Sequence, residues 1–381
     1  MSQHHHPQSP VMDHCPETLA AAAYYDAGWY AREQRTIWAR NWVAAGRLND
    51  LRPGTMRKVQ IGAASVILCR APDGGLSAFH NTCRHRGAEL CSQDEAPMGR
   101  LLTCKYHAWS YAAHDGRLMA VGHATPTSDF RKEDHGLIPV SIKVWNGFLF
   151  LNLAADPGEL QPDLGLDCLN NWPMDRLITG HRMVRDLACN WKVFWENYNE
   201  CLHCPGVHPE LCDMVPVYAK GIMARNEAAD WTPDEPPAQV LKDGAATWTA
   251  SGQPCGPVFP GLTAIERQNG FNFVTVYPTM FIVAHVDHVR AVMLQPLGPE
   301  ITRLTAEWYF PQETLNQPGF DAAEVAAFAK IVMDQDADVA ELNQRGLRSP
   351  AYRHGRLMPE EYAIHDFHKW VLRNMDEGAG S

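Results

Sequence analysis

Apolar and polar residues alternate with two different periods along the chain. Apolar residues at helical spacing predict a helical segment over about residues 16–41, with Trp29 and Trp38 on its apolar face. From residue 42 to residue 153, short β-branched runs such as "SVILC", "LSAFH" and "VWNGFLFLNL" alternate with Asp-Gly and Asn-Gly turn pairs. The period of two and the turn pairs predict a small all-β domain.

A Pro- and Asp-rich stretch, "AADPGELQPDLG", predicts a linker after this domain. Beyond it, the pattern predicts a larger α+β segment. It has a helix at "CNWKVFWENYNECLH", a long irregular excursion over about residues 230–260, a long helix over 321–347 and a last helix over 361–375. Antiparallel strands are expected at "FNFVTVYPTMFIVAHV", "RAVMLQPL" and "RLTAEWYF", with Pro278 at a bulge or a sheet edge. We therefore expect three parts: an N-terminal helical segment (1–41) that packs on the C-terminal domain, a β domain (42–154) and the α+β C-terminal domain itself (155–381).

Composition narrows the classes of function. The 381 residues are 45% hydrophobic and carry a net charge of −11, which argues against a nucleic-acid partner. No apolar run approaches the length of a membrane span, and the opening residues show no export signal. The eleven cysteines are an odd number scattered along a long chain, so we expect unpaired thiols and a cytoplasmic location.

Two short segments each combine one cysteine with one histidine: Cys83 with His85, and Cys104 with His107. Two thiolates and two imidazoles form the ligand set of a Rieske-type [2Fe–2S] centre, in which the imidazoles raise the reduction potential. A structural zinc site is the alternative interpretation of these four residues. Zinc knuckles usually pair cysteine with cysteine and histidine with histidine, whereas both segments here are mixed.

A one-electron relay needs a destination, and His203 and His208 are the best candidates. Their spacing of five residues would place the imidazoles about 140° apart on a regular helix. Pro205 and Gly206 break that helix and allow the imidazoles to converge. Two imidazoles and one carboxylate form the facial triad of non-haem Fe(II) oxygenases.

The long helix offers the carboxylate. Asp336 shares a mostly apolar stripe with Val332 and Asn343, whereas Asp334 and Asp338 lie on a solvated stripe. A carboxylate on an apolar face needs a cation nearby, so Asp336 is the predicted third ligand. Glu200, one helical turn before the first histidine of the pair, can hold the free N–H of a ligand imidazole.

With these motifs in place, the sequence resembles the oxygenase (α) components of the Rieske-type non-haem iron oxygenases. The resemblance covers nearly the whole chain, from the C-x-H and C-x-x-H segments through "NWK…EN" to the late "DxxxxExxQRGL" segment. The segment "ENYNECLHC…HPEL" is most similar to sequences of the branch that acts on quaternary ammonium compounds such as glycine betaine, proline betaine and carnitine. In ring-hydroxylating members the acid at the position of Glu200 is more often Asp.

The resemblance implies a Rieske β domain followed by a helix-grip (START-like) catalytic domain, with a [2Fe–2S] cluster and a mononuclear Fe(II) as cofactors. It implies O₂ as co-substrate, a homotrimer in which Glu200 carries electrons between subunits, and a separate flavin and iron–sulfur reductase that uses NAD(P)H. A cationic substrate would need aromatic faces. The candidates are Trp195, Phe273, Tyr277, Phe281 and Trp308.

Three functions follow from this reading. The first is N-demethylation or hydroxylation of a small quaternary ammonium compound by a monooxygenase. The second is hydroxylation of an aromatic ring. The third is electron transfer by a Rieske protein without oxygenase activity, which would leave everything after about residue 150 unexplained.

Overall fold

The computed structural model describes residues 8–235 and 240–376, and its contacts divide the chain into two compact units. The first unit joins the N-terminal residues up to Glu33 with everything from Gln161 onward, and the second spans Gln34–Leu160. Each unit is described by itself below. In the described residues, no helix is long and apolar enough to cross a membrane.

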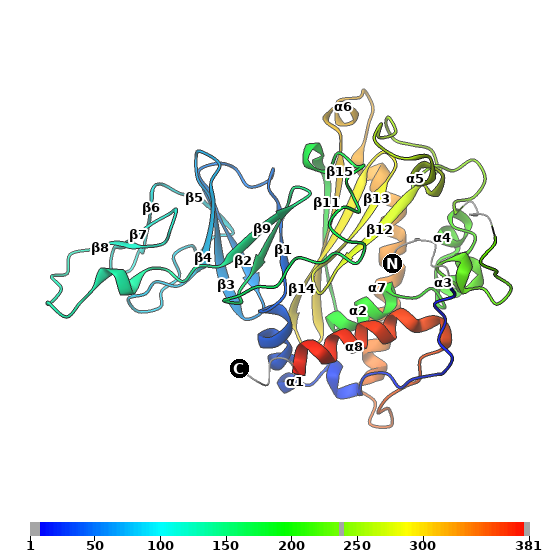
Figure 1. Ribbon diagram of the computed structural model, residues 1–381, viewed down its shortest axis with the longest axis horizontal. Helices are drawn as coiled ribbons and strands as arrows, with labels where there is room; N and C mark the ends of the chain where they lie inside the picture. The colour runs from blue at the N-terminus through cyan, green and yellow to red at the C-terminus, as the bar shows by residue number, and fades with distance from the viewer. Residues whose placement is uncertain (1–7, 236–239, 377–381) are drawn as a thin grey trace. The chain divides into compact units, whose positions relative to one another are not determined.

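The Gln34–Leu160 unit is built almost entirely from short antiparallel strands, as the alternating pattern predicts. They form three sheets, in the orders β1-β10-β9, β4-β3-β2-β5 and β6-β7-β8 (Figure 1). The strands are β1 (Val43–Arg47), β2 (Thr55–Ile61), β3 (Ala64–Arg70), β4 (Leu76–His80), β5 (Glu95–Pro97), β6 (Leu101–Thr103), β7 (Trp109–Ala112), β8 (Leu118–Val121), β9 (Ser141–Trp145) and β10 (Phe148–Asn152), with short helices η2 (Gln34–Trp38) and η3 (Lys132–His135).

The other unit is organised around one antiparallel sheet in the order β11-β15-β14-β13-β12. Its strands are β11 (Ile178–Leu187), β12 (Phe271–Val276), β13 (Met280–His285), β14 (Val289–Gly298) and β15 (Ile301–Phe310). Its helices are η1 (Ala21–Tyr24), α1 (Ala27–Glu33), η4 (Met174–Arg176), α2 (Trp191–Tyr198), α3 (Cys204–Val207), α4 (Pro209–Met214), η5 (Tyr218–Lys220), η6 (Arg225–Glu227), α5 (Ala264–Asn269), α6 (Gln312–Leu315), α7 (Ala322–Leu347), η7 (Pro359–Glu361) and α8 (Tyr362–Asp376).

Helices α2, α7 and α8 pack together in this unit. In Figure 1, α2 and α8 lie side by side near one end of the sheet, where the rings of Trp191 and Phe367 meet edge to face at 5.8 Å. Helix α7 packs against both α2 and strand β11. This arrangement holds one face of α2 and one face of α7 towards the sheet.

Several details differ from the sequence prediction. The helical segment predicted over 16–41 is divided into three short helices, η1, α1 and η2. Residues 1–7, which belong to the predicted N-terminal segment, lie outside the described residues. The helix predicted to reach His203 ends at Tyr198. The prediction that Pro278 lies at a bulge or an edge is wrong, because this residue lies in the turn between β12 and β13.

A buried ion pair connects α1 and α2. Lys192 and Glu33 are both fully buried, and the Lys192 ammonium contacts Glu33 and, at 2.8 Å, Asn190 Oδ1. The same carboxylate accepts hydrogen bonds from the indole N–H groups of Trp29 (2.9 Å) and Trp191 (2.8 Å). The pair therefore leaves few polar atoms unsatisfied.

We expect the substitution Lys192→Met to lower the free energy of unfolding by about 3–5 kcal/mol, because it leaves a buried carboxylate without its cation. Urea unfolding followed by tryptophan fluorescence measures the loss. The control is Lys369→Met, which removes an exposed pair with Asp366 on α8 and should cost less than about 1 kcal/mol. Equal losses in the two variants would contradict this account.

Candidate iron centres and the adjoining cavity

The two Cys/His segments lie on neighbouring loops of the β unit. Cys83 and Cys104 are buried in one apolar core, whereas the imidazole of His85 is exposed. The rings of His85 and His107 lie 4.7 Å apart between centroids. Two buried sulfurs and two more accessible imidazoles on facing loops fit a [2Fe–2S] cluster with mixed ligands.

Local backbone geometry shapes these loops. Gly87 has φ of 78° and donates its N–H to Cys83 O at 2.9 Å, which closes the first loop. Against the second loop lies Gly122, which follows β8; a Cβ there would lie 2.3 Å from His107 O, so only glycine fits. Around the sulfurs, the Tyr111 hydroxyl lies 3.2 Å from Cys83 Sγ.

The aromatic side chains of the second loop differ in role. Trp109 and Tyr111 are buried, and Trp109 stacks on His85 with centroids 4.8 Å apart. Tyr106 is 59% exposed and does not bury the site. Burial and hydrogen bonding of the ligands by Trp109 and Tyr111 are the features that tune such a centre.

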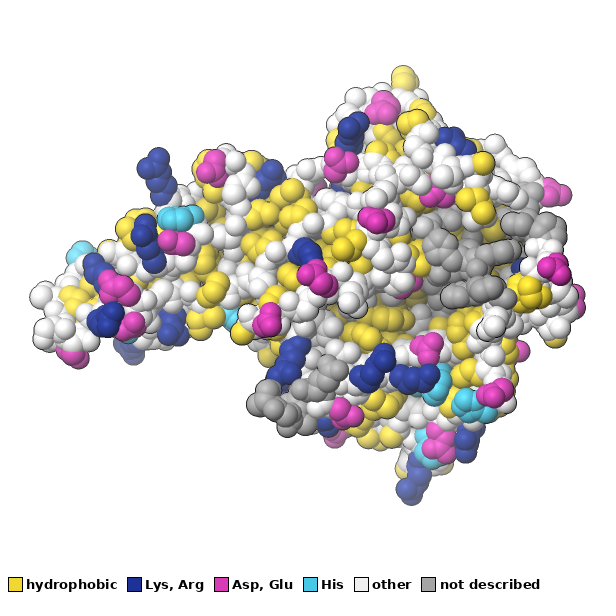
Figure 2. Space-filling model, viewed as in Figure 1, with side chains coloured by type: hydrophobic (Ala, Val, Ile, Leu, Met, Phe, Trp, Pro, Cys, Tyr) yellow, Lys and Arg dark blue, Asp and Glu magenta, His cyan; other side chains and the backbone are white. Residues whose placement is uncertain are grey.

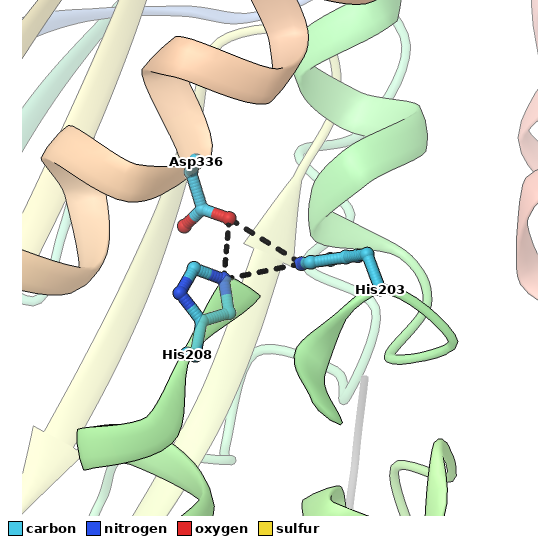
Figure 3. Close-up of side chains that lie close together, drawn as sticks. All are labelled: His203, His208 and Asp336. Atoms are coloured by element: carbon cyan, nitrogen blue, oxygen red, sulfur yellow. Dashed lines mark hydrogen bonds and ion pairs between the residues drawn. The ribbon is translucent and has the colours of Figure 1, made fainter. Parts of the chain in front are cut away.

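His203, His208 and Asp336 converge in the other unit (Figure 3). His208 Nε2 lies 2.9 Å from Asp336 Oδ1 and 3.2 Å from His203 Nε2, and the third distance, from His203 Nε2 to Asp336 Oδ1, is 3.4 Å. Metal–ligand bonds of about 2.1 Å that meet at right angles separate their donor atoms by about 3.0 Å. The three side chains therefore fit one metal ion on a shared face, with the opposite positions open.

The local sequence explains how the histidines converge. After α2 ends, the short helix α3 spans Cys204–Val207 and α4 starts at Pro209, so His208 lies at the break between two helices. The carboxylate comes from the middle of α7, where Val332 is buried on the same stripe. The sequence analysis placed Asn343 on the same stripe. In the structure Asn343 is exposed, and its neighbour Gln344 is the buried residue.

Other polar groups orient the two imidazoles. Glu200 binds His203 Nδ1, and its second oxygen accepts the backbone N–H of Leu202. Gln335 Oε1 lies 2.8 Å from His208 Nδ1, a contact that sequence reasoning missed. With both Nδ1 atoms engaged, both Nε2 atoms are directed to the shared position, as second-layer contacts do in metal sites.

The charges of this cluster are coupled. Burial would lower the pKa of His203, but Asp336 and Glu200 outweigh it and raise that pKa to about 9. Burial would likewise raise the pKa of Asp336, yet the two imidazoles hold it below its ordinary value. A carboxylate that stays ionised and imidazoles that must lose a proton to bind metal are the usual donors of a divalent cation.

Cys201 and Cys204 form a disulfide around His203, with Cα atoms 4.9 Å apart. This differs from the expectation that all thiols are unpaired. The turn that follows α2 brings the two cysteines within the usual Cα separation of a disulfide. The other described cysteines are free.

An open cavity of about 800 Å³, including the space at its mouth, adjoins the three metal-ligand candidates. Its walls come from α2, α7 and the sheet. The Phe, Tyr and Trp side chains that line the cavity are Phe194, Tyr198, Tyr218, Trp248, Phe273 and Phe281. Tyr198 and Phe281 have ring centroids 4.3 Å apart. The cavity is of the size and character of small-molecule sites.

Of the aromatics expected at the substrate site, Phe273 and Phe281 line this cavity. Trp195, Tyr277 and Trp308 do not. Trp195 packs edge to face on Tyr277 at 4.8 Å and donates its indole N–H to Pro278 O, and Trp308 contacts His181. These three side chains belong to the packed interior.

Comparisons with known proteins agree with both domains. Residues 174–377 match the family "Ring hydroxylating alpha subunit (catalytic domain)", and residues 41–131 match "Rieske [2Fe-2S] domain". The chain belongs to the Rieske non-haem iron oxygenases, as an α subunit. It is therefore a monooxygenase of this family, with a Rieske [2Fe–2S] cluster and a catalytic non-haem iron domain. The predicted fold class and cofactors are confirmed.

Similar proteins include the glycine betaine monooxygenase oxygenase subunit of Chromohalobacter salexigens, which is 30% identical over 94% of this chain and 86% of its own length. The carnitine monooxygenase oxygenase subunit of Acinetobacter baumannii is 28% identical over 90% of this chain and 89% of its own. The crystal structure of the quaternary ammonium Rieske monooxygenase CntA with L-carnitine superposes with a TM-score of 0.70, at 20% identity, over 95% of this chain and 96% of that one. The predicted resemblance to the quaternary ammonium branch is confirmed.

Proposed function

We propose that this Rieske oxygenase N-demethylates a small quaternary ammonium compound, such as glycine betaine or proline betaine. O₂ is the co-substrate, and electrons come from NAD(P)H through a separate flavin and iron–sulfur reductase. The observation that carries the proposal is the aromatic wall of the cavity beside His203, His208 and Asp336. The names of the relatives, which act on glycine betaine and carnitine, support it.

A quaternary ammonium group has no N–H to donate, so a protein binds it through the faces of aromatic rings. Phe194, Tyr198 and Phe281 stand close together in the cavity, with Phe194 and Phe281 at 6.1 Å between centroids. Their faces also exclude water from the reacting methyl group. The face drawn in Figure 2 carries scattered charges of both signs.

Each polar residue of the site has a separate task in this proposal. His203, His208 and Asp336 would hold the iron, which supplies O₂ activation when bound. Glu200 fixes the ring of His203, and Gln335 fixes the ring of His208. The aromatic residues position an N-methyl group of the substrate beside the ligand triad. Cys83, His85, Cys104 and His107 would hold the cluster that delivers electrons.

Glu200 is also the proposed path for electrons between subunits of a homotrimer. Its carboxylate lies against His203 Nδ1, and its side chain is 11% exposed. In the other direction, an acid at this place can reach an imidazole of a neighbouring subunit. The assignment rests on the family resemblance together with the contact to His203.

We expect Glu200→Gln to lower turnover by about 10- to 100-fold while both metal centres stay loaded, because the amide cannot carry the charge that holds His203. Iron content, cluster absorption and product formation measure this. Glu210→Gln is the matched control, since this acid contacts Gln335 near the site and is exposed. Near-normal rates in Glu200→Gln would rule out the bridging role.

A single-turnover experiment tests the substrate class. Reduced holoprotein is mixed anaerobically with glycine betaine, proline betaine, carnitine or benzoate and then exposed to O₂. Formaldehyde release with a betaine is the expected result. A hydroxylated ring from benzoate without any formaldehyde would instead support ring hydroxylation.

A further inference from the structure

Arg290 is a charged residue on an otherwise largely apolar part of the cavity wall. It lies near the start of β14, where it pairs in register with Val283 of β13 and Trp308 of β15. Its side chain lines the same cavity as Asp336, yet the residue is only 5% exposed. The guanidinium is therefore held inside the substrate cavity and not at the protein surface.

This guanidinium has no hydrogen bond or ion pair with any of the described residues, 8–235 and 240–376. Its contact is the ring of Phe281, whose centroid lies 5.8 Å from Arg290 Cζ, and its Nε is buried without a partner. Other arginines of the chain differ. The guanidinium of Arg303 donates to both oxygens of Asp186, and the buried guanidinium of Arg47 donates to a backbone carbonyl.

Asp336 attracts Arg290 electrostatically but forms no ion pair with it. The Oδ1 of Asp336 is engaged by His208 and His203, and no ion pair joins Asp336 to the arginine among the described residues. Burial lowers the pKa of Arg290 to about 10, so the group remains a cation at neutral pH. A buried cation that forms no ion pair or hydrogen bond is destabilising, so its position needs an anion to explain it.

We propose that Arg290 binds the carboxylate of a zwitterionic substrate and so selects betaines over quaternary ammonium alcohols such as choline. The inference rests on the proposed function and adds a second contact to it. The planar guanidinium matches a carboxylate with two parallel hydrogen bonds. The rings of Phe194, Tyr198 and Phe281 receive the ammonium end. A compound with a cation and no anion would instead place its charge near an uncompensated guanidinium.

The first test compares kcat/KM for glycine betaine and choline in the wild-type holoenzyme and in Arg290→Gln. Loss of one partner of a buried charge pair should lower the value for glycine betaine at least about 30-fold. The value for choline should stay the same or rise. The control is Arg303→Gln, on the neighbouring strand, which should leave the ratio of the two values unchanged. An equal loss for both compounds would overturn the proposal, because it would assign Arg290 to iron binding or folding.

A second variant distinguishes a loss of carboxylate binding from a loss of the fold. Arg290→Lys keeps the charge but loses the two-pronged geometry, so its ratio of kcat/KM for glycine betaine over choline should lie between those of the wild type and Arg290→Gln. Iron content and circular dichroism verify the fold of both variants. If Arg290→Gln does not fold, an unchanged ratio in Arg290→Lys would overturn the proposal, and a lowered ratio would support it.

Analogues that lack the ammonium charge separate this inference from the proposed function. The carbon analogue of glycine betaine is tert-butylacetate, and that of choline is tert-butylethanol; neither carries a cation. Calorimetry with the holoprotein should show tighter binding of tert-butylacetate, and Arg290→Gln should remove the preference. This result would support the carboxylate site even if no quaternary ammonium compound is turned over. Equal binding of tert-butylacetate to wild type and variant would overturn it.

Discussion

The substitution His203→Ala should lower substrate oxidation by more than about 100-fold while the brown colour of the cluster is retained. Removal of a residue that only supports a metal ligand already costs about 10- to 100-fold, so loss of a ligand should cost more. His203 contributes one of three donor atoms that lie within 3.4 Å of each other. The cluster ligands belong to the other compact unit and are unaffected by this change.

Product formation, iron content and the visible spectrum together measure this result. The mononuclear iron should be lost and the two irons of the cluster kept. His354→Ala is the control, because His354 is an exposed histidine of the same unit whose charged neighbour is Glu17. Unchanged oxidation in His203→Ala would remove the case for this iron site.

The substitution Cys83→Ala should bleach the protein and abolish electron transfer to the substrate. The thiolate is one of the four proposed ligands of the cluster, and its sulfur is buried beside the Tyr111 hydroxyl. Metal analysis should then find the mononuclear iron without the two irons of the cluster. The loss of the Rieske EPR signal is the direct measurement.

Cys91→Ala is the matched control for this experiment. Cys91 lies in the same apolar core as Cys83 and is equally buried, but its thiol donates to the Gln93 carbonyl at 3.2 Å. The variant should keep the cluster. A Rieske signal retained in Cys83→Ala would show that the ligands had been assigned wrongly.

The two cluster segments can be picked out of the sequence because their proposed ligands lie close together along the chain. Each segment places a cysteine and a histidine two or three residues apart, so local turns alone bring the donors together. The triad needed a longer argument. His203 and His208 converge because the chain breaks between them, and Asp336 was selected among neighbouring acids by the stripe of α7 on which it lies.

The walls of the cavity were predicted less well. Helix α2 is buried on two sides: Phe194 and Tyr198 face the cavity, while Trp195 packs on Tyr277. Hydrophobicity does not distinguish two buried faces, so the phase of the helix could not be read from its pattern. Trp248 comes from an irregular segment, where no period exists to place it.

Strand β11 was missed for a related reason. It lies at the edge of its sheet, and its residues alternate between half-buried and exposed positions with few large apolar side chains. Edge strands carry charged residues that weaken the hydrophobic pattern. Its pairing with β15 is visible only once the whole sheet is assembled.

The irregular segment that carries Trp248 is fastened at its base by Asp287, whose carboxylate accepts the Thr247 hydroxyl at 2.8 Å and the Cys255 N–H at 2.7 Å. Its Asp243-Gly244 corner is exposed, and such corners accept insertions and deletions during evolution. Because the same segment supplies Trp248 to the cavity wall, changes within it would alter the cavity, while His203, His208 and Asp336 are inherited unchanged. Substrate preference and oxygen chemistry would then evolve on separate stretches of the gene.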